Sequence, residues 1–348
     1  MEQIEQCKLA IDTMDTPERK GVTRNIEDLT LIHSGRVVST IAACPSICFT
    51  REGQAFFLKH ASHEEYRQLM MFKEMGIPIP NRVAYSDGML ATSFAGYPLS
   101  LSPKDDIQKY EEAGELLRYL HAVLNNQSGS VPDAVLSSSE KSTGHIIRNF
   151  RYRFLQRQSK ATNALLEQRI PVETPLGKLR DSILDTAGSY SFRCSDVDCD
   201  EHDRDVIYGD YKSDNILSTG EGGGLVLIDP DVRKGCCSFD IAKFVSRSLL
   251  ENIDCKSLIH AFLKGYGFHE ETEVPYGELH FRDQVAIEMI NILSAYAGRW
   301  LQNDGTFRLI NRFGDQEYLA YLTHLLDGMS SSAHLRDRTA QPRVPALK

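Results

Sequence analysis

The spacing of hydrophobic and polar residues changes near residue 100, and this change divides the chain into two parts. Between residues 26 and 94, short β-prone runs alternate with turn residues, as at 86–88, where Ser-Asp-Gly separates two runs. One helical pattern interrupts them at residues 63–76, where apolar side chains recur every three or four positions until the prolines of Gly-Ile-Pro-Ile-Pro end it. This part is predicted to be a small β-rich unit with one helix.

Beyond residue 100 the spacing is mostly helical. Ala113, Leu117 and Leu120 fall on one face of the first long segment. Helices are predicted over residues 105–124, 148–168, 239–252, 256–267 and within 278–327. The β-prone segments 205–217 and 223–232 interrupt them and are predicted to form a strand–loop–strand pair. A β-rich part followed by a larger helical part predicts an α+β fold with two lobes.

These patterns also set the expected boundaries. Residues 1–94 are assigned to the N-terminal lobe, with a leader over approximately the first 25 residues, and residues 95–329 to the C-terminal lobe. Residues 330–348 are polar, hold two prolines and lack periodicity, so we expect them to form a disordered tail.

Composition and charge narrow the class of protein. The 348 residues are 41% hydrophobic and 25% charged, which is ordinary for a globular protein. No run of about 18 uncharged apolar residues is present, and the chain does not begin like a signal peptide, so we expect a cytoplasmic protein without a membrane partner. A formal net charge of −9 argues against a nucleic-acid partner and permits a cationic substrate. A monomer or a homodimer is expected.

Eight cysteines raise the question of a metal site. The candidate zinc ligands are Cys194, Cys199, His202, Cys236 and Cys237. Their spacing contains no C-x-x-C and fits no familiar zinc pattern, so we expect free, reduced thiols.

The strongest chemical pattern is Tyr-Gly-Asp-Tyr-Lys-Ser-Asp-Asn at 208–215, followed by Leu-Ile-Asp-Pro-Asp at 227–231. Phosphoryl transfer needs metal-bridged phosphates, a positioned acceptor hydroxyl and neutralised charge, with little covalent help from the protein. The Asp210 carboxylate can accept the proton of a hydroxyl. The side-chain oxygens of Asn215 and Asp229 suit magnesium, a hard cation that prefers oxygen ligands. The pattern therefore indicates phosphoryl-transfer chemistry.

These motifs resemble the catalytic and metal-binding loops of the aminoglycoside phosphotransferase and choline kinase-like superfamily, which has a protein-kinase-like fold. Tyr208 stands where many members have a scaffold histidine, so we expect altered loop packing with intact chemistry. Asp240, in Phe-Asp-Ile-Ala, resembles the family's aspartate that buttresses the catalytic loop. His121 resembles the histidine of a Leu-His pair that ends a helix in the family, and we expect it to be a packed core residue.

The resemblance extends upstream and implies how ATP is held. Lys59, in Phe-Leu-Lys, is similar to the strand lysine that binds the α- and β-phosphates. Glu65 lies thirteen residues before Pro78, a spacing similar to that of the glutamate that pairs with this lysine, and Glu64 is an adjacent alternative.

Two further segments are implied to contact the nucleotide. Thr92, Ser93 and Phe94 resemble the linker that hydrogen-bonds the adenine. Ser34 and Gly35 stand where the phosphate-covering loop is expected, although this loop has only one glycine. The resemblance runs from about residue 30 to residue 270.

The resemblance implies an ATP- and Mg²⁺-dependent enzyme that transfers the γ-phosphate to a hydroxyl of a small molecule. An aminoglycoside or other antibiotic, an amino alcohol and a sugar-like metabolite all remain open as acceptors, and so does GTP as the donor. The alternative is a pseudokinase scaffold that binds a nucleotide without turnover. A protein kinase is disfavoured because Asp229 and Asp240 lie only eleven positions apart, which leaves little room for an activation segment.

Six acidic residues lie between positions 196 and 205, just before the catalytic strand. Such a run is usually a solvated loop. The other interpretation is an anionic rim that attracts a polycationic acceptor, to which Asp214 and Asp231 would add negative charge.

Overall fold

The computed structural model describes most of the predicted elements. The described residues are 47–51, 54–86, 88–93, 95–99, 107–126, 131, 135–136, 172–191, 205–219, 223–251, 255–269, 281–301 and 315–339. Several expectations lie outside them: the leader, Ser34, Gly35, Phe94, the helix at 148–168 and residues 196–204 of the acidic run.

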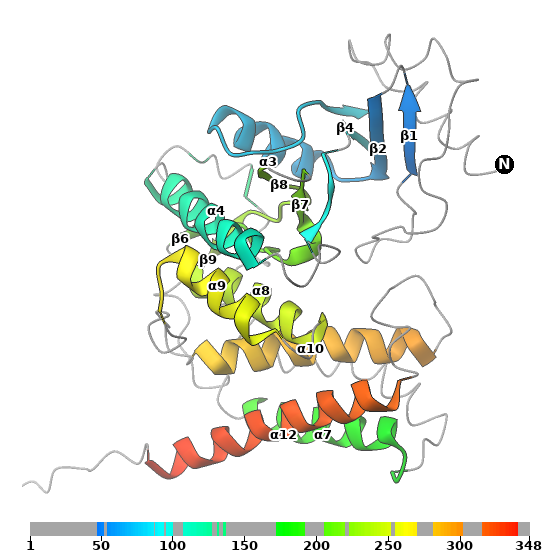
Figure 1. Cartoon of the computed structure of the whole chain (residues 1–348), viewed down its shortest axis with the longest axis vertical. Coiled ribbons are helices and arrows are strands. Elements are labelled where there is room, and N and C mark those ends of the chain that lie inside the picture. Colours follow the sequence, from blue (N-terminus) through cyan, green and yellow to red (C-terminus); the bar gives the residue numbers. More distant parts are fainter. Residues whose placement is uncertain are drawn as a thin grey trace, which may run out of the picture.

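The N-terminal part is an antiparallel sheet of four strands in the order β1-β2-β4-β3, with one helix against it (Figure 1). The strands are β1 (Ile47–Arg51), β2 (Gln54–His60), β3 (Val83–Ser86) and β4 (Met89–Ser93), and α3 (His63–Glu74) connects β2 to β3. The helix and the two strands around the 86–88 turn are therefore confirmed.

Local chemistry explains where α3 begins and ends. The Ser62 hydroxyl accepts a hydrogen bond from the Glu65 amide at 3.1 Å and caps the first turn. Leu69 and Phe72 are buried on its inner face. Gly76, with a φ of 73°, then takes the left-handed conformation that ends the helical turn.

The strands around the two sequence motifs at 208–215 and 227–231 are divided between two small sheets. One has the order β5-β7-β8 and the other pairs β6 with β9. Their bounds are Tyr97–Pro98 for β5, Asp205–Ile207 for β6, Ile216–Ser218 for β7, Leu225–Leu227 for β8 and Arg233–Gly235 for β9. The prediction of a single strand–loop–strand pair therefore accounts for only part of this region. The chain turns away between β6 and β7, so β6 finds its partner in a strand that comes after the second motif.

A short 3-10 helix, η5 (Ser213–Asn215), lies between β6 and β7, and the remaining elements of the described chain are six α-helices. They are α4 (Ile107–Asn126), α7 (Pro175–Ser191), α8 (Cys237–Glu251), α9 (Lys256–Tyr266), α10 (Phe281–Leu301) and α12 (Gln316–Thr339). Helix α4 lies along α9, α8 packs against α10, and α7 packs against α12 at the end opposite the four-stranded sheet (Figure 1). Among the described residues, no helix is both long and apolar enough to cross a membrane.

Helix α12 extends into the segment that was expected to form a disordered tail. Helix α12 continues to Thr339, so residues 330–339 are helical. The two prolines that suggested an irregular tail come later, at positions 342 and 345, and therefore do not interrupt the helix.

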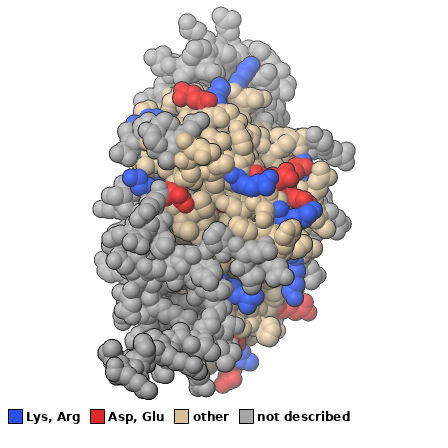
Figure 2. Space-filling view, turned by 90° about the vertical axis from the view of Figure 1, so that its left-hand side faces the viewer, with Lys and Arg blue, Asp and Glu red and all other residues tan. Residues whose placement is uncertain are grey.

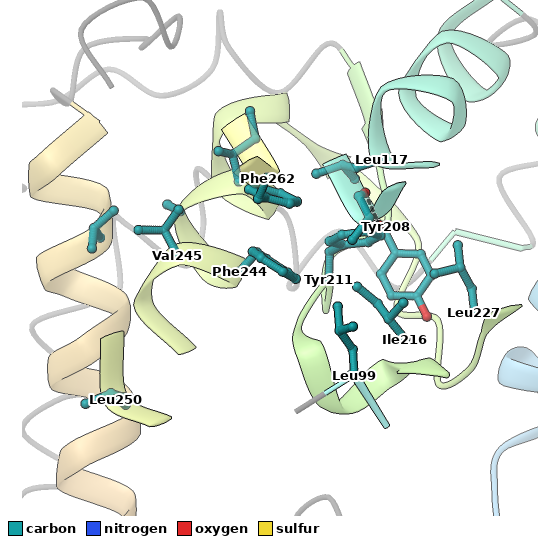
Figure 3. Packing of buried hydrophobic residues seen from close by; sticks show 14 of the residues in the cluster. Leu99, Leu117, Tyr208, Tyr211, Ile216, Leu227, Phe244, Val245, Leu250 and Phe262 are labelled. Carbon is teal, nitrogen blue, oxygen red and sulfur yellow. Dashed lines mark hydrogen bonds between the residues drawn. The ribbon is translucent and has the colours of Figure 1, made fainter. Parts of the chain in front are cut away.

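The buried side chains form a continuous cluster that reaches the catalytic loop. Phe244 of α8 stacks on Phe262 of α9 with ring centroids 3.8 Å apart. Tyr211 lies beside both rings, and its hydroxyl donates to the Ala113 carbonyl at 2.6 Å (Figure 3). The loop that carries Asp210 is therefore anchored in the core by its neighbouring aromatic side chain.

Helices α4 and α9 approach so closely that each needs a glycine where it meets the backbone of the other. A Cβ on Gly114 would lie 2.0 Å from the Phe262 carbonyl oxygen, and one on Gly265 would lie 1.9 Å from that of Glu111. We expect Gly265→Ala to lower the free energy of unfolding by about 2 kcal/mol, because the helices must move apart. The matched control is Gly328→Ala on α12, where a Cβ meets nothing within 4 Å. Urea unfolding of both variants checks this, and equal stabilities would contradict it.

Candidate active site

The candidate catalytic loop, residues 208–215, starts with a backbone conformation that requires glycine. Gly209 has a φ of 80°, and a Cβ there would lie 2.2 Å from the Asp231 carbonyl oxygen. The Asp231 amide donates to the Tyr208 carbonyl at 3.1 Å, which joins the loop to the segment after β8. Glycine therefore lets two chain segments meet directly before Asp210.

Tyr208 packs as a scaffold residue in the place where histidine was expected. Its ring is fully buried and stacks on Phe72 of α3, with centroids 5.9 Å apart. Its hydroxyl donates to the carbonyl of Ile228, the residue before Asp229. Burial raises the pKa of this phenol well above its ordinary value, so it remains a neutral donor. Tyr208 thus connects the catalytic loop with the second motif.

Asp240 supports the loop from α8, as expected. Its buried carboxylate accepts hydrogen bonds from the amides of Tyr208 and Gly209, both at 2.8 Å. His121 Nε2 lies 3.0 Å from the same carboxylate, and His121 Nδ1 lies 2.8 Å from the Tyr266 hydroxyl. His121 is buried and packed, also as expected. This network fixes the direction in which the loop leaves β6.

Asp210 is held by three donors. Lys212 Nζ and Asn215 Nδ2 lie 2.8 and 2.9 Å from its Oδ2, and Lys243 Nζ lies 2.7 Å from its Oδ1. Burial alone would raise the pKa of this carboxyl, but the two ammonium groups outweigh burial and hold its pKa well below its usual range. Asp210 is therefore ionised at neutral pH and can accept a hydrogen bond from a hydroxyl.

The hairpin of β7 and β8 brings the two predicted metal ligands to the same end. Ile216 pairs with Leu227, so Asn215 comes just before one strand and Asp229 just after the other. The Ile228 amide donates to the Asn215 carbonyl at 3.0 Å. Among the described residues, the buried Asn215 Oδ1 has no hydrogen-bond partner. An orphaned amide oxygen, with the Asp229 carboxylate at the same end of the hairpin, fits the donors that a hard divalent cation requires.

Lys59 joins the N-terminal sheet to this hairpin. Its Nζ lies 2.6 Å from Glu65 Oε1 and also forms an ion pair with Asp229. Burial alone would lower the pKa of Lys59, but the two carboxylates outweigh burial and raise it. Burial, with repulsion from Asp229, raises the pKa of Glu65 to about 7. Of the two neighbouring glutamates that the sequence left open, Glu65 is thus the one that contacts Lys59.

The structure adds Gln68, which sequence reasoning missed. Gln68 is 1% exposed, and its amide donates to the Val135 carbonyl at 2.8 Å and accepts from the Val232 amide at 3.2 Å. It lies three residues after Glu65, close to one helical turn, so it fixes that turn of α3 to the chain segment that follows Asp229. The sign of Gln68 in the sequence was a polar side chain next to the apolar positions of the predicted helix.

We expect Gln68→Leu to lower the free energy of unfolding by about 2 kcal/mol, because the Val232 amide and the Val135 carbonyl lose their partner inside the protein. The matched control is Gln108→Leu on α4, an exposed side chain whose bond to Glu112 is worth little. Chemical unfolding compares the two, and an equal loss would show that Gln68 is not a structural link.

The acidic residues near the chemistry are paired with arginine. Asp231 contacts Arg233, whose guanidinium also donates to the Gly209 carbonyl at 2.9 Å. Asp214 contacts Arg247. Figure 2 shows Lys and Arg side chains beside Asp and Glu side chains on one face of the molecule. Asp231 thus has an arginine partner, whereas Asp214 shares Arg247 with Glu251, so charges of both signs lie side by side here.

The predicted adenine-binding residues are placed only in part. Thr92 pairs with Phe57 and Val83 across neighbouring strands. The Ser93 amide donates to the Arg82 carbonyl at 2.9 Å, and the Ser93 hydroxyl accepts from the Arg82 amide. Both residues are thus the last two of strand β4. Their role in binding a nucleotide stays a prediction.

The thiols show no sign of a zinc site in the described part of the chain. No disulfide joins Cys236, Cys237 or Cys255, and no group of three or more His, Cys, Asp or Glu residues there is arranged to hold a metal. Cys194, Cys199 and His202 lie outside the described residues.

Comparison with known proteins finds similarity at the level of structure. No family model and no curated protein matches the chain. An amicoumacin kinase in complex with AMP-PNP and Ca²⁺ is 15% identical, with a TM-score of 0.54 over 95% of this chain and 93% of that one. An aminoglycoside phosphotransferase from Alicyclobacillus acidocaldarius is 14% identical, with a TM-score of 0.53 over 95% and 96%.

A spectinomycin phosphotransferase in complex with ADP and spectinomycin is also 14% identical, with a TM-score of 0.52 over 88% and 93%. The chain therefore has the protein-kinase-like fold of these small-molecule phosphotransferases. The resemblance predicted from the sequence motifs is confirmed at the level of the fold.

Proposed function

We propose that this chain is an ATP- and Mg²⁺-dependent kinase that phosphorylates a hydroxyl of a small molecule. One observation carries the proposal: Lys59, Glu65 and Asp229 meet in one ion-pair cluster, while Asp210 and Asn215 are hydrogen-bonded on the adjoining loop. Phosphoryl transfer needs this combination of a phosphate-binding cation, oxygen ligands for a metal and a carboxylate facing the acceptor.

Each of these side chains has a separate role in the proposed reaction. Lys59 neutralises charge on the α- and β-phosphates, and Glu65 keeps its ammonium in place. Asp210 accepts the proton of the acceptor hydroxyl as the acceptor oxygen forms a bond to the γ-phosphorus. The bond from that phosphorus to the β-bridging oxygen breaks, and ADP leaves. Because its pKa is low, Asp210 serves first to orient the hydroxyl and takes the proton late.

Asn215 Oδ1 and the Asp229 carboxylate would hold the magnesium ion. When bound, the metal neutralises charge on the β- and γ-phosphates. We assign the adenine to the end of β4, at Thr92, Ser93 and Phe94. ADP and AMP-PNP in the similar structures support a nucleotide site in this fold.

The site also fits the expected division into two lobes, with the boundary near residue 94. Lys59 and Glu65 come from the N-terminal sheet and its helix, and Asp210, Asn215 and Asp229 come from the part beyond that boundary. The phosphates would bind where the two sets meet. Closure between two lobes would align the acceptor hydroxyl with the γ-phosphate.

The segment after Asp229 favours a small acceptor over a peptide. The eleven positions to Asp240 already contain β9 and the first turn of α8. Little chain is left to form a peptide-binding segment of the kind that protein kinases use.

The test is direct. Thermal unfolding is measured with ATP, with and without Mg²⁺, and transfer from γ-labelled ATP is then measured to a panel of amino sugars, amino alcohols, sugars and sugar acids. We expect Mg²⁺-dependent stabilisation by ATP and transfer to at least one class. Binding without transfer to any acceptor would instead support the nucleotide-binding scaffold.

A further inference from the structure

The hydrogen bonds at Asp210 indicate where the acceptor hydroxyl approaches. Each carboxylate oxygen has about two lone-pair sites. Oδ2 already accepts from Lys212 and Asn215, whereas among the described residues Oδ1 has the ammonium of Lys243 as its one partner. The open position is therefore on Oδ1, and a hydroxyl that binds there lies beside Lys243 Nζ.

Lys243 is held in this position by its surroundings. It lies one turn after Asp240 on α8, and its side chain is only 17% exposed. Its Nζ also donates to the Gly209 carbonyl at 3.2 Å and lies 5.7 Å from the centre of the Phe239 ring. The ammonium group is thus pre-organised at the position where an acceptor would bind.

The charge closest to the open position on Oδ1 is the ammonium of Lys243. Lys212 and Lys243 both form ion pairs with the single carboxylate of Asp210. Of the neighbouring acids, Asp231 contacts Arg233, and Asp214 contacts Arg247, which also pairs with Glu251. An ammonium group on the acceptor would therefore meet a like charge, whereas a compact anionic group would meet a partner.

We infer that Lys243 determines the specificity for the acceptor, and that the acceptor carries a carboxylate or phosphate group beside the hydroxyl that is phosphorylated. This inference rests on the proposed kinase function and narrows it. It favours hydroxy acids and phosphorylated hydroxyl compounds over the amino sugars and amino alcohols that the fold alone would allow.

The experiment uses four acceptors that share one diol: glycerol, glycerate, glycerol 3-phosphate and 3-amino-1,2-propanediol. Phosphate transfer from γ-labelled ATP is measured with the full chain and corrected for ATP hydrolysis. We expect kcat/KM for glycerate or glycerol 3-phosphate to exceed that for glycerol by about tenfold, and the aminodiol to fall about tenfold below glycerol. The two anionic compounds distinguish carboxylate from phosphate.

The variants decide whether Lys243 causes this order. Lys243→Met is expected to bring the four values within about threefold of one another, mainly through the acceptor KM, whereas Lys243→Arg retains the order because it keeps the charge. Lys234→Met, which removes an exposed lysine on β9, is the matched control and should leave the order unchanged. A lysine that only stabilised the fold would lower all four values together.

Several results would overturn the inference. They are a preference for the aminodiol, the same order in Lys243→Met as in the wild type, or transfer confined to neutral or cationic compounds of the wider panel. Nucleotide binding without transfer to any compound has a different meaning, because it removes the proposed function on which the inference rests.

Discussion

Asp210→Asn is expected to lower kcat for phosphate transfer by about 10³-fold, the range typical of a lost proton acceptor. The amide keeps the size of the side chain but cannot take up a proton. It also removes the negative charge that Lys212 and Lys243 share. Steady-state transfer to an acceptor identified by the panel measures the effect. Thermal unfolding with ATP and Mg²⁺ shows whether the nucleotide still binds.

The control for this substitution is Asp181→Asn on α7, where the aspartate side chain is 40% exposed and pairs with the neighbouring Arg180. It makes the same change of charge away from the loop and should leave kcat unchanged. If Asp210→Asn transfers phosphate as fast as the wild type, Asp210 does not accept the proton and the mechanism is wrong. A loss of kcat with retained ATP stabilisation separates chemistry from folding.

Asp240→Asn is expected to lower the free energy of unfolding by about 3 kcal/mol, because at least one buried amide of the loop loses its acceptor. The carboxylate now accepts from the amides of Tyr208 and Gly209 with different oxygens. An asparagine has only one oxygen, so its NH₂ must face the other N–H donor. Urea unfolding with an unchanged m-value measures the loss.

Ser246→Ala provides the control on the same helix. Ser246 is also buried in α8, but its hydroxyl only donates to the Lys243 carbonyl within the helix, at 2.9 Å. Its removal should cost no more than about 1 kcal/mol. A smaller loss for Asp240→Asn than for Ser246→Ala would mean that the loop does not depend on this carboxylate. Transfer activity should fall with Asp240→Asn as well, because the loop carries Asp210.

The sequence was most informative where one short segment supplies several functional groups. Asp210 and Asn215 are five residues apart, so their proximity follows from a single turn of chain. Helix α3 was predictable because its apolar spacing and the following prolines indicate the same element. The buttressing role of Asp240 was available only through the resemblance, since nothing local shows which amides it contacts.

The residues that were missed act across long sequence separations. Gln68 contacts Val232, 164 positions away, and Lys243 reaches the loop residue Asp210 from helix α8. Single-sequence patterns report the face of an element but not the element opposite it. The pairing of β6 with β9 was missed for the same reason, because hairpins between neighbouring strands are the only pairings that local turn signals predict.

The β7–β8 hairpin has a consequence for how the chain tolerates length changes. The two proposed metal ligands flank its open end, whereas the turn between Thr219 and Gly224 closes the opposite end. Extra residues in that turn leave the register of Ile216 with Leu227 intact, so a peptide tag inserted there would keep the spacing of the ligands. A single residue inserted after Ile228 would displace Asp229 relative to Asn215. Inserted residues are therefore expected to be tolerated at one end of this hairpin and not at the other.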